Sequence, residues 1–170
     1  MRSVDIANTF LLRHGDRMPL TNLKLNKLVY YAQVESVRAA GRALFDDEIE
    51  AWRYGPVTRA VYDEFKRYGR SPIPGASGPC AADPYAVCIV DDVAESYGQM
   101  SAFDLVELTH REGGAWRRVF SPDVDEVITV ADIAASRDME GFPGLAGTAV
   151  EAIAKVTSSI PNALNLLKNS

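Results

Sequence analysis

The sequence predicts a mainly α (α+β) fold: a compact helical domain around a central buried helix, with a small β-sheet or hairpin. The longest helical pattern covers residues 21–40, and apolar side chains occupy most of the circumference of that helix. One segment, residues 49–54, alternates apolar and polar side chains as a strand does. A helix that is apolar on most sides needs neighbours on several of them, which places it in the middle of the domain.

The length and composition are those of one globular domain. The chain has 170 residues, of which 47% are hydrophobic and 24% are charged, and its net charge is −5. Residues 1–75 hold 12 basic and 9 acidic side chains, whereas residues 76–170 hold 6 and 14. Because the overall charge repels a phosphate backbone, we expect no direct nucleic-acid partner.

The sequence shows no sign of secretion or of membrane insertion. Asp5 and Asn8 interrupt the first apolar stretch, and nowhere do about 18 apolar residues follow one another, as a membrane span needs. We therefore expect a cytoplasmic protein without a membrane partner. In that compartment Cys80 and Cys88 are expected to be free thiols.

Two helices and their ends can be assigned in the first part of the chain. Residues 4–14 have helical spacing, and Gly15 ends the pattern. Thr21 is the expected N-cap of the long helix, which should close at Gly41. A narrow polar stripe on this helix is expected at the surface, and it contains Lys24, Lys27, Tyr31, Glu35 and Arg38.

The remaining elements are shorter. The expected strand 49–54 stops at Gly55-Pro56, and the Pro/Gly-rich residues 69–84 form a loop. We expect helices at 57–68, 91–97, 101–111 and 131–139, and a short strand at 127–130. Residues 1–140 form the expected domain, and residues 141–170 a C-terminal helical extension, crossed by Pro161 and packed on the same domain.

The string RHGDRMP, residues Arg13 to Pro19, is similar to the motif of histidine acid phosphatases. In those enzymes the string follows a buried strand and acts with a second histidine in an HD or HE pair. Here the preceding residues have helical spacing, and the other histidine, His110, is followed by Arg111. We favour an exposed turn after a helix, with a small phosphatase that uses Arg13, His14 and Arg17 as the alternative.

Other catalytic or ligand-binding chemistry has little support. Two histidines and two cysteines, at these spacings, do not make a four-ligand metal site. No glycine-rich phosphate loop of the GxxxxGK[ST] or GxGxxG type is present. We therefore expect no metal and no cofactor.

Aromatic and cationic side chains concentrate in residues 24–31, 52–56 and 109–116. Such side chains are typical of the centres of protein interfaces. We expect the two tryptophans in the core and the lysines at the surface. The candidate partner-binding residues are Lys24, Lys27, Tyr31, Trp52, Arg53, Tyr54, His110 and Trp116.

These same strings carry a family resemblance. Residues 23–33 (LKLNKLVYYAQ), 49–57 (IEAWRYGPV) and 108–112 (LTHRE) followed by Trp116 resemble the Panacea domain, the GepA-like family of phage- and plasmid-associated proteins. The resemblance implies a non-catalytic antitoxin that neutralises a cognate protein toxin by direct contact. An adaptor that delivers a bound partner to a protease is an alternative, and the oligomeric state stays open.

Overall fold

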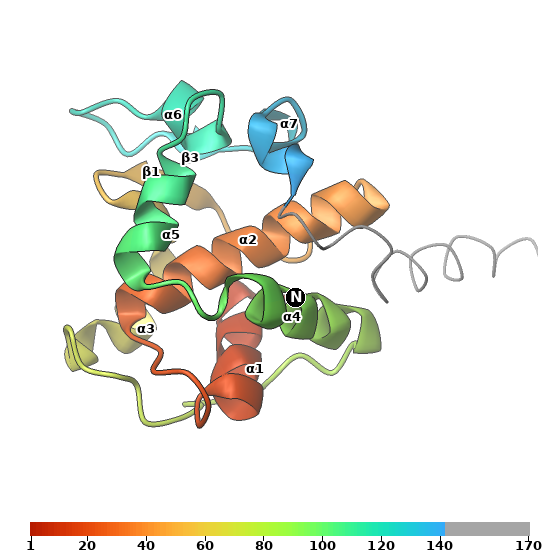
Figure 1. Cartoon of the computed structure of the whole chain (residues 1–170), viewed down its shortest axis with the longest axis vertical. Coiled ribbons are helices and arrows are strands. Elements are labelled where there is room, and N and C mark those ends of the chain that lie inside the picture. Colours follow the sequence, from red (N-terminus) through yellow and green to blue (C-terminus); the bar gives the residue numbers. More distant parts are fainter. Residues whose placement is uncertain (142–170) are drawn as a thin grey trace, which may run out of the picture.

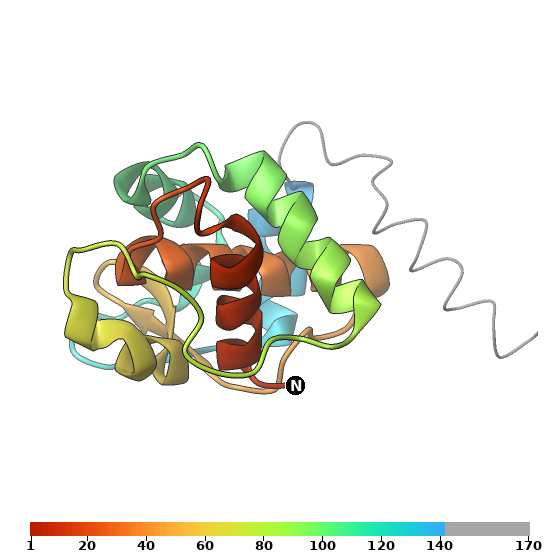
Figure 2. The same ribbon diagram turned by 90° about the horizontal axis from the view of Figure 1, so that it is seen from below.

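The computed structural model describes residues 1–141, and helix α2 runs through the middle of them (Figure 1). It contacts α1, α3, α4, α5, α7, β2 and η2, so neighbours surround it (Figure 2). This confirms the expected fold class and the central buried helix. The helices are α1 (Ser3–His14), α2 (Asn22–Ala40), α3 (Arg59–Phe65), η1 (Lys66–Tyr68), α4 (Pro84–Tyr97), α5 (Ala102–Thr109), α6 (Ala115–Val119), α7 (Val130–Ala134) and η2 (Arg137–Glu140).

Local capping explains where the central helix begins and ends. The Thr21 hydroxyl accepts a hydrogen bond from the Lys24 N–H at 3.3 Å, which satisfies one of the free donors of the first turn. Gly41 ends the helix with φ of 64°, a left-handed conformation that glycine adopts without a steric penalty. Both ends lie where the sequence predicts them. The expected extension, residues 141–170, lies outside the described residues except for Gly141.

The small sheet contains β1 (Ile49–Trp52), β2 (Gly55–Thr58) and β3 (Val127–Ile128), in the antiparallel order β2-β1-β3. The strand expected at residues 49–54 ends at Trp52, before Gly55-Pro56. The second strand that these two residues begin was not predicted, so the helix expected from residue 57 starts only at Arg59. Pro56 is tolerated because β2 is an edge strand, whose outer side does not need its N–H.

Three further boundaries differ from the prediction. Helix α4 begins at Pro84 rather than at residue 91, since the Asp83 side chain caps it and proline suits the first helical position. The five-residue helix α6 was not predicted, because it is too short for a periodic pattern. The predicted helix 131–139 is divided into α7 and η2, with Ser136 as the cap of the second.

The polar stripe of α2 is buried, which corrects the expectation that Lys24, Lys27 and Tyr31 lie at the surface. Their exposed fractions are 8%, 0% and 2%. The Lys24 ammonium donates to the Gly98 carbonyl at 2.6 Å, and the Lys27 ammonium donates to the Pro56 carbonyl at 2.8 Å. Tyr31 stacks on Tyr97 with ring centroids 4.4 Å apart. Both ammonium groups therefore reach a carbonyl of a neighbouring segment rather than water, whereas the Tyr31 hydroxyl has no hydrogen-bond partner among the described residues.

Other side chains of α2 hold adjacent backbone in the same way. The side-chain amide oxygen of Asn26 accepts a hydrogen bond from the Thr58 N–H at 3.2 Å, on the outer edge of β2. The Gln33 side chain accepts from the Leu44 N–H at 2.8 Å in the loop after the helix. Helix α2 is thus both the hydrophobic centre and the polar anchor of the surrounding segments.

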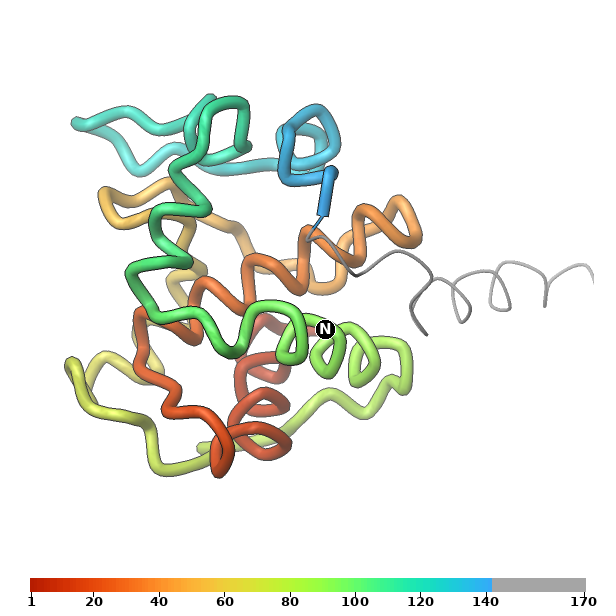
Figure 3. The backbone as a smooth tube through the Cα atoms, in the orientation of Figure 1, coloured from red at the N-terminus to blue at the C-terminus, as the bar shows by residue number. Residues whose placement is uncertain are grey.

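Residues 69–83 form a long connection that lies along α1 (Figure 3). Asn8 donates to the Pro79 carbonyl at 3.1 Å and accepts from the Ser77 N–H at 3.0 Å. Thr9 accepts from the Ala81 N–H at 2.8 Å. The predicted loop is therefore confirmed, and α1 holds it through buried polar side chains.

The two tryptophans differ in burial. Trp116 is 3% exposed and donates its indole N–H to the Trp52 carbonyl at 2.8 Å, whereas the side chain of Trp52 is half-buried. We expect Trp116→Ala to lower the free energy of unfolding by about 3–5 kcal/mol, and Trp52→Ala to lower it by less. Urea denaturation of the two variants measures both effects. An unchanged midpoint for Trp116→Ala would contradict its place in the core.

Burial lowers the pKa of Lys27 from 10.5 to about 7. Above that pKa the unfolded chain binds this proton more tightly than the folded chain does, so stability should rise with pH, by up to about 1.4 kcal/mol per pH unit. We expect Lys27→Met to flatten the rise between pH 7 and about pH 9, where tyrosines of the unfolded chain are still mostly protonated.

Denaturant titrations at several pH values measure this slope. Lys66→Met is the matched control, because Lys66 is exposed and that variant should keep the wild-type slope. Parallel slopes for wild type and Lys27→Met would refute a proton-binding role of the buried ammonium.

Candidate functional site

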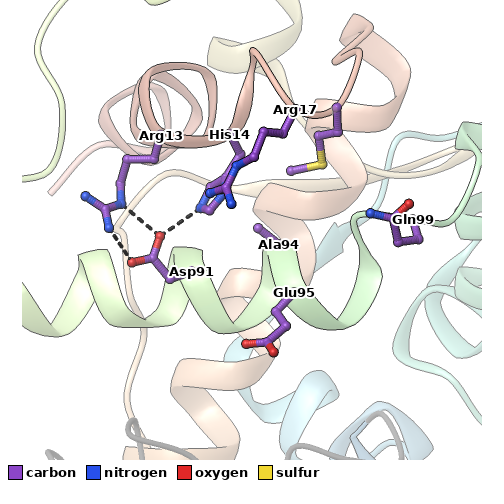
Figure 4. A pocket seen from close by; sticks show the side chains of 8 residues that line it. Arg13, His14, Arg17, Asp91, Ala94, Glu95 and Gln99 are labelled. Atoms are coloured by element: carbon purple, nitrogen blue, oxygen red, sulfur yellow. Dashed lines mark hydrogen bonds and ion pairs between the residues drawn. The ribbon is translucent and has the colours of Figure 1, made fainter.

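A pocket of about 480 Å³ lies between the end of α1 and helix α4 (Figure 4). Arg13 contacts both carboxylate oxygens of Asp91, at 2.8 and 2.6 Å, and the His14 Nε2 lies 2.7 Å from the same carboxylate. Arg17 approaches the His14 Nδ1 at 3.4 Å. Partial burial of Asp91 opposes its ionisation, but the hydrogen bonds from Arg13 and His14 outweigh this and lower its pKa.

In this arrangement Arg13 and His14 of the RHGDRMP string connect α1 to Asp91 of α4. The string begins in the last turn of helix α1 rather than after a strand, and Asp91 already occupies Arg13 and one nitrogen of His14. A phosphate in this pocket would meet the carboxylates of Asp91 and Glu95. His110 lies elsewhere, stacked on Trp116 with ring centroids 3.7 Å apart. The cluster therefore joins α1 to α4, and its geometry does not support phosphate chemistry.

Among residues 1–141, no group of three His, Cys, Asp or Glu side chains is arranged to hold a metal ion. Nor does any described helix combine the length and apolar character that a membrane crossing requires.

The three strings singled out in the sequence meet at one buried junction. Gly55 has φ of 100°, and an added Cβ there would lie 2.7 Å from the Thr109 hydroxyl and 2.9 Å from the Lys27 Cε. Glycine is therefore required both by the backbone conformation and by this close approach. Next to it, Trp116 bonds the end of β1 and stacks on His110. The junction fixes the hairpin between α2 and α5.

His110 is half-buried at this junction. Its burial lowers its pKa, and the charges of Lys27 and Arg117 lower it further. Among the described residues its Nε2 has no hydrogen-bond partner. His110 therefore acts chiefly as an aromatic surface against Trp116.

A second buried anchor, Asp138, was missed in the sequence. Its carboxylate accepts from the Tyr30 hydroxyl at 2.7 Å and from the Ala115 N–H at 2.9 Å, and Arg111 lies 3.2 Å away. These contacts join η2, α2 and α6. A single acidic residue with partners 23 or more positions away leaves no local signal in a sequence.

The exposed candidates lie at a different place, which we call the aromatic groove. It has a volume of about 310 Å³ and lies at the N-terminal end of α2, beside the β1–β2 turn and α3. Tyr54 is 59% exposed and Arg53 is exposed as well. The residues that line it are Asn22, Leu23, Asn26, Trp52, Arg53, Tyr54, Val57, Tyr62, Lys66 and Gly69.

The structure thus divides the eight candidates into two groups. Lys24, Lys27, Tyr31, His110 and Trp116 belong to the interior or its margin, whereas Trp52, Arg53 and Tyr54 line the aromatic groove. Tyr62 and Lys66 were not predicted as part of a site. Tyr62 lies off the apolar face of its helix and is 37% exposed, and that irregularity was the available signal.

Comparisons with known proteins identify a family and a relative of this chain. The family model described as "Antitoxin SocA-like, Panacea domain" matches residues 25–117. Antitoxin SocA of Caulobacter vibrioides (strain NA1000 / CB15N) is 32% identical over 113 residues, which cover 58% of this chain and 59% of that relative. The chain thus aligns with less than two thirds of the relative's length.

No solved structure matches the chain. The family match covers more than half of the chain and includes all of the residues that meet at the buried junction. The chain therefore belongs to the family of SocA-like antitoxins with a Panacea domain.

Proposed function

We propose that this protein is an antitoxin that neutralises a cognate protein toxin by direct binding, without catalysis. The observation that carries the proposal is the family match over residues 25–117, the part of the chain that forms the buried junction. The same match supports a toxin as the partner.

The physical arrangement supports inhibition by contact. The motif residues are used inside the domain, where they fix the hairpin, α2 and α5 to one another. The rigid scaffold that results leaves the aromatic groove at the surface, and a binding protein needs such a combination. The His14 cluster is used to connect two helices.

Co-expression with the product of the adjacent gene tests the proposal. We expect that product to arrest growth alone, and this protein to restore growth and to form a stable complex with it. Rescue should survive His14→Ala, because His14 contributes only a contact between α1 and α4. Lack of rescue and of a complex would contradict the proposal, as would a phosphomonoesterase activity of the purified protein that His14→Ala abolishes.

The lifetime of the partner separates inhibition by binding from delivery to a protease. In a pulse-chase of the adjacent gene product, an inhibitor that only covers its target leaves the lifetime unchanged or prolongs it. A shorter lifetime in the presence of this protein would contradict inhibition by contact and would indicate the adaptor role.

A further inference from the structure

The floor of the aromatic groove is held in one arrangement before any partner arrives. The Trp52 ring meets Tyr62 edge-on with centroids 4.9 Å apart, and the Arg59 guanidinium lies 5.1 Å from the Trp52 ring. The indole N–H donates to Glu50 at 2.6 Å, so its polar group is already used. A rigid aromatic ring without free polar groups binds an apolar side chain with little loss of conformational entropy.

One positive charge at the groove is available to a partner. Arg59 is paired with Glu50, and Lys66 is paired with Asp63 at 2.8 Å. The Arg53 guanidinium instead lies 5.7 Å from the Tyr54 ring, and none of the ion pairs within residues 1–141 includes it. The groove lining contains no carboxylate. A carboxylate from outside would therefore meet attraction from Arg53 and no repulsion from the lining.

We propose that the aromatic groove is the docking site for a segment of the toxin that presents a carboxylate to Arg53 and an adjacent apolar or aromatic side chain to Trp52 and Tyr62. This inference rests on the proposed antitoxin function. It assigns the contact to a locally positive groove although the chain as a whole carries a net charge of −5. Trp, Tyr and Arg are also the residue types that dominate the binding energy of protein interfaces.

Substitutions at the β1–β2 turn test the site without disturbing the core. Arg53→Glu and Tyr54→Ala change exposed side chains, so we expect the wild-type melting temperature. The probe is the adjacent gene product that arrests growth in the co-expression assay. We expect each substitution to weaken its binding at least about tenfold by calorimetry, and Arg53→Glu to abolish growth rescue.

The matched control is Arg42→Glu. Arg42 is also exposed and also lies over a tyrosine, with its guanidinium 4.6 Å from the Tyr85 ring. It follows the C-terminal end of α2, about 28 Å along the helix from the groove. Because the change in charge is the same, a general electrostatic effect would weaken the binding of both variants equally. Wild-type binding by Arg42→Glu is the expected result.

A charge exchange identifies the partner side chain. Exposed acidic residues of the toxin are replaced by lysine one at a time, and each toxin variant is tested against the Arg53→Glu variant of this protein. One toxin variant should bind Arg53→Glu more tightly than the unmodified toxin binds it. Absence of any such compensation would overturn the assignment of a carboxylate to Arg53.

Other outcomes overturn the docking site in distinguishable ways. If the wild type binds the toxin and Arg53→Glu and Tyr54→Ala bind equally well, the contact lies elsewhere while the antitoxin function stands. If these variants change the oligomeric state in sedimentation but not toxin binding, a second copy of this chain occupies the groove. If the wild type itself neither binds nor rescues, the proposed function fails.

Discussion

Burial of α2 on every side is the constraint on which the rest of the structure depends. A helix in that position cannot leave polar side chains to water, and an unpaired buried polar group costs about 1–3 kcal/mol. Lys24, Asn26, Lys27 and Gln33 instead bond to the backbone of three segments, namely Gly98 after α4, strand β2, and the loop at Leu44. Each bond requires its segment to pass one defined point on the helix, so the polar side chains determine where the surrounding chain lies.

The hairpin shows this determination in detail. The outer edge of β2 presents the Pro56 carbonyl and the Thr58 N–H, and Lys27 and Asn26 bond to them. An edge strand whose polar groups are already bonded does not recruit a further strand. The same contact brings the lysine stem so close to Gly55 that no side chain fits there. The contact of Lys27 with β2 therefore both occupies the outer edge of that strand and requires glycine at position 55.

Features that depend on residues close together in the sequence could be predicted, whereas contacts between residues far apart in the sequence could not. Thr21 and Gly41 mark the ends of α2 because caps act within a few residues. Helical periodicity also located the buried helix. It misplaced Lys27, because a helical wheel registers polarity but not the presence of a carbonyl from residue 56. Asp138 was missed for the same reason, and only Trp52, Arg53 and Tyr54 of the groove lining were predicted, since the parts of the groove are far apart in sequence.

The separation of inward and outward residues determines how mutations in this family member should be interpreted. Substitution of Lys24, Tyr31 or Trp116 removes buried contacts, and a loss of function would then follow from a loss of fold. Such a result would not identify the proposed binding surface, even though these residues lie within the matched family region.

Substitutions in the β1–β2 turn should leave the fold intact. Trp116 of the buried junction bonds to the backbone at the end of β1, while the side chains of the turn stay exposed. The exposed side chains of the turn can therefore be substituted while the buried junction residues stay the same. The junction residues of the matched family region and the exposed groove that we propose as the binding surface are therefore different parts of the chain, and only substitutions at the exposed residues test that proposal.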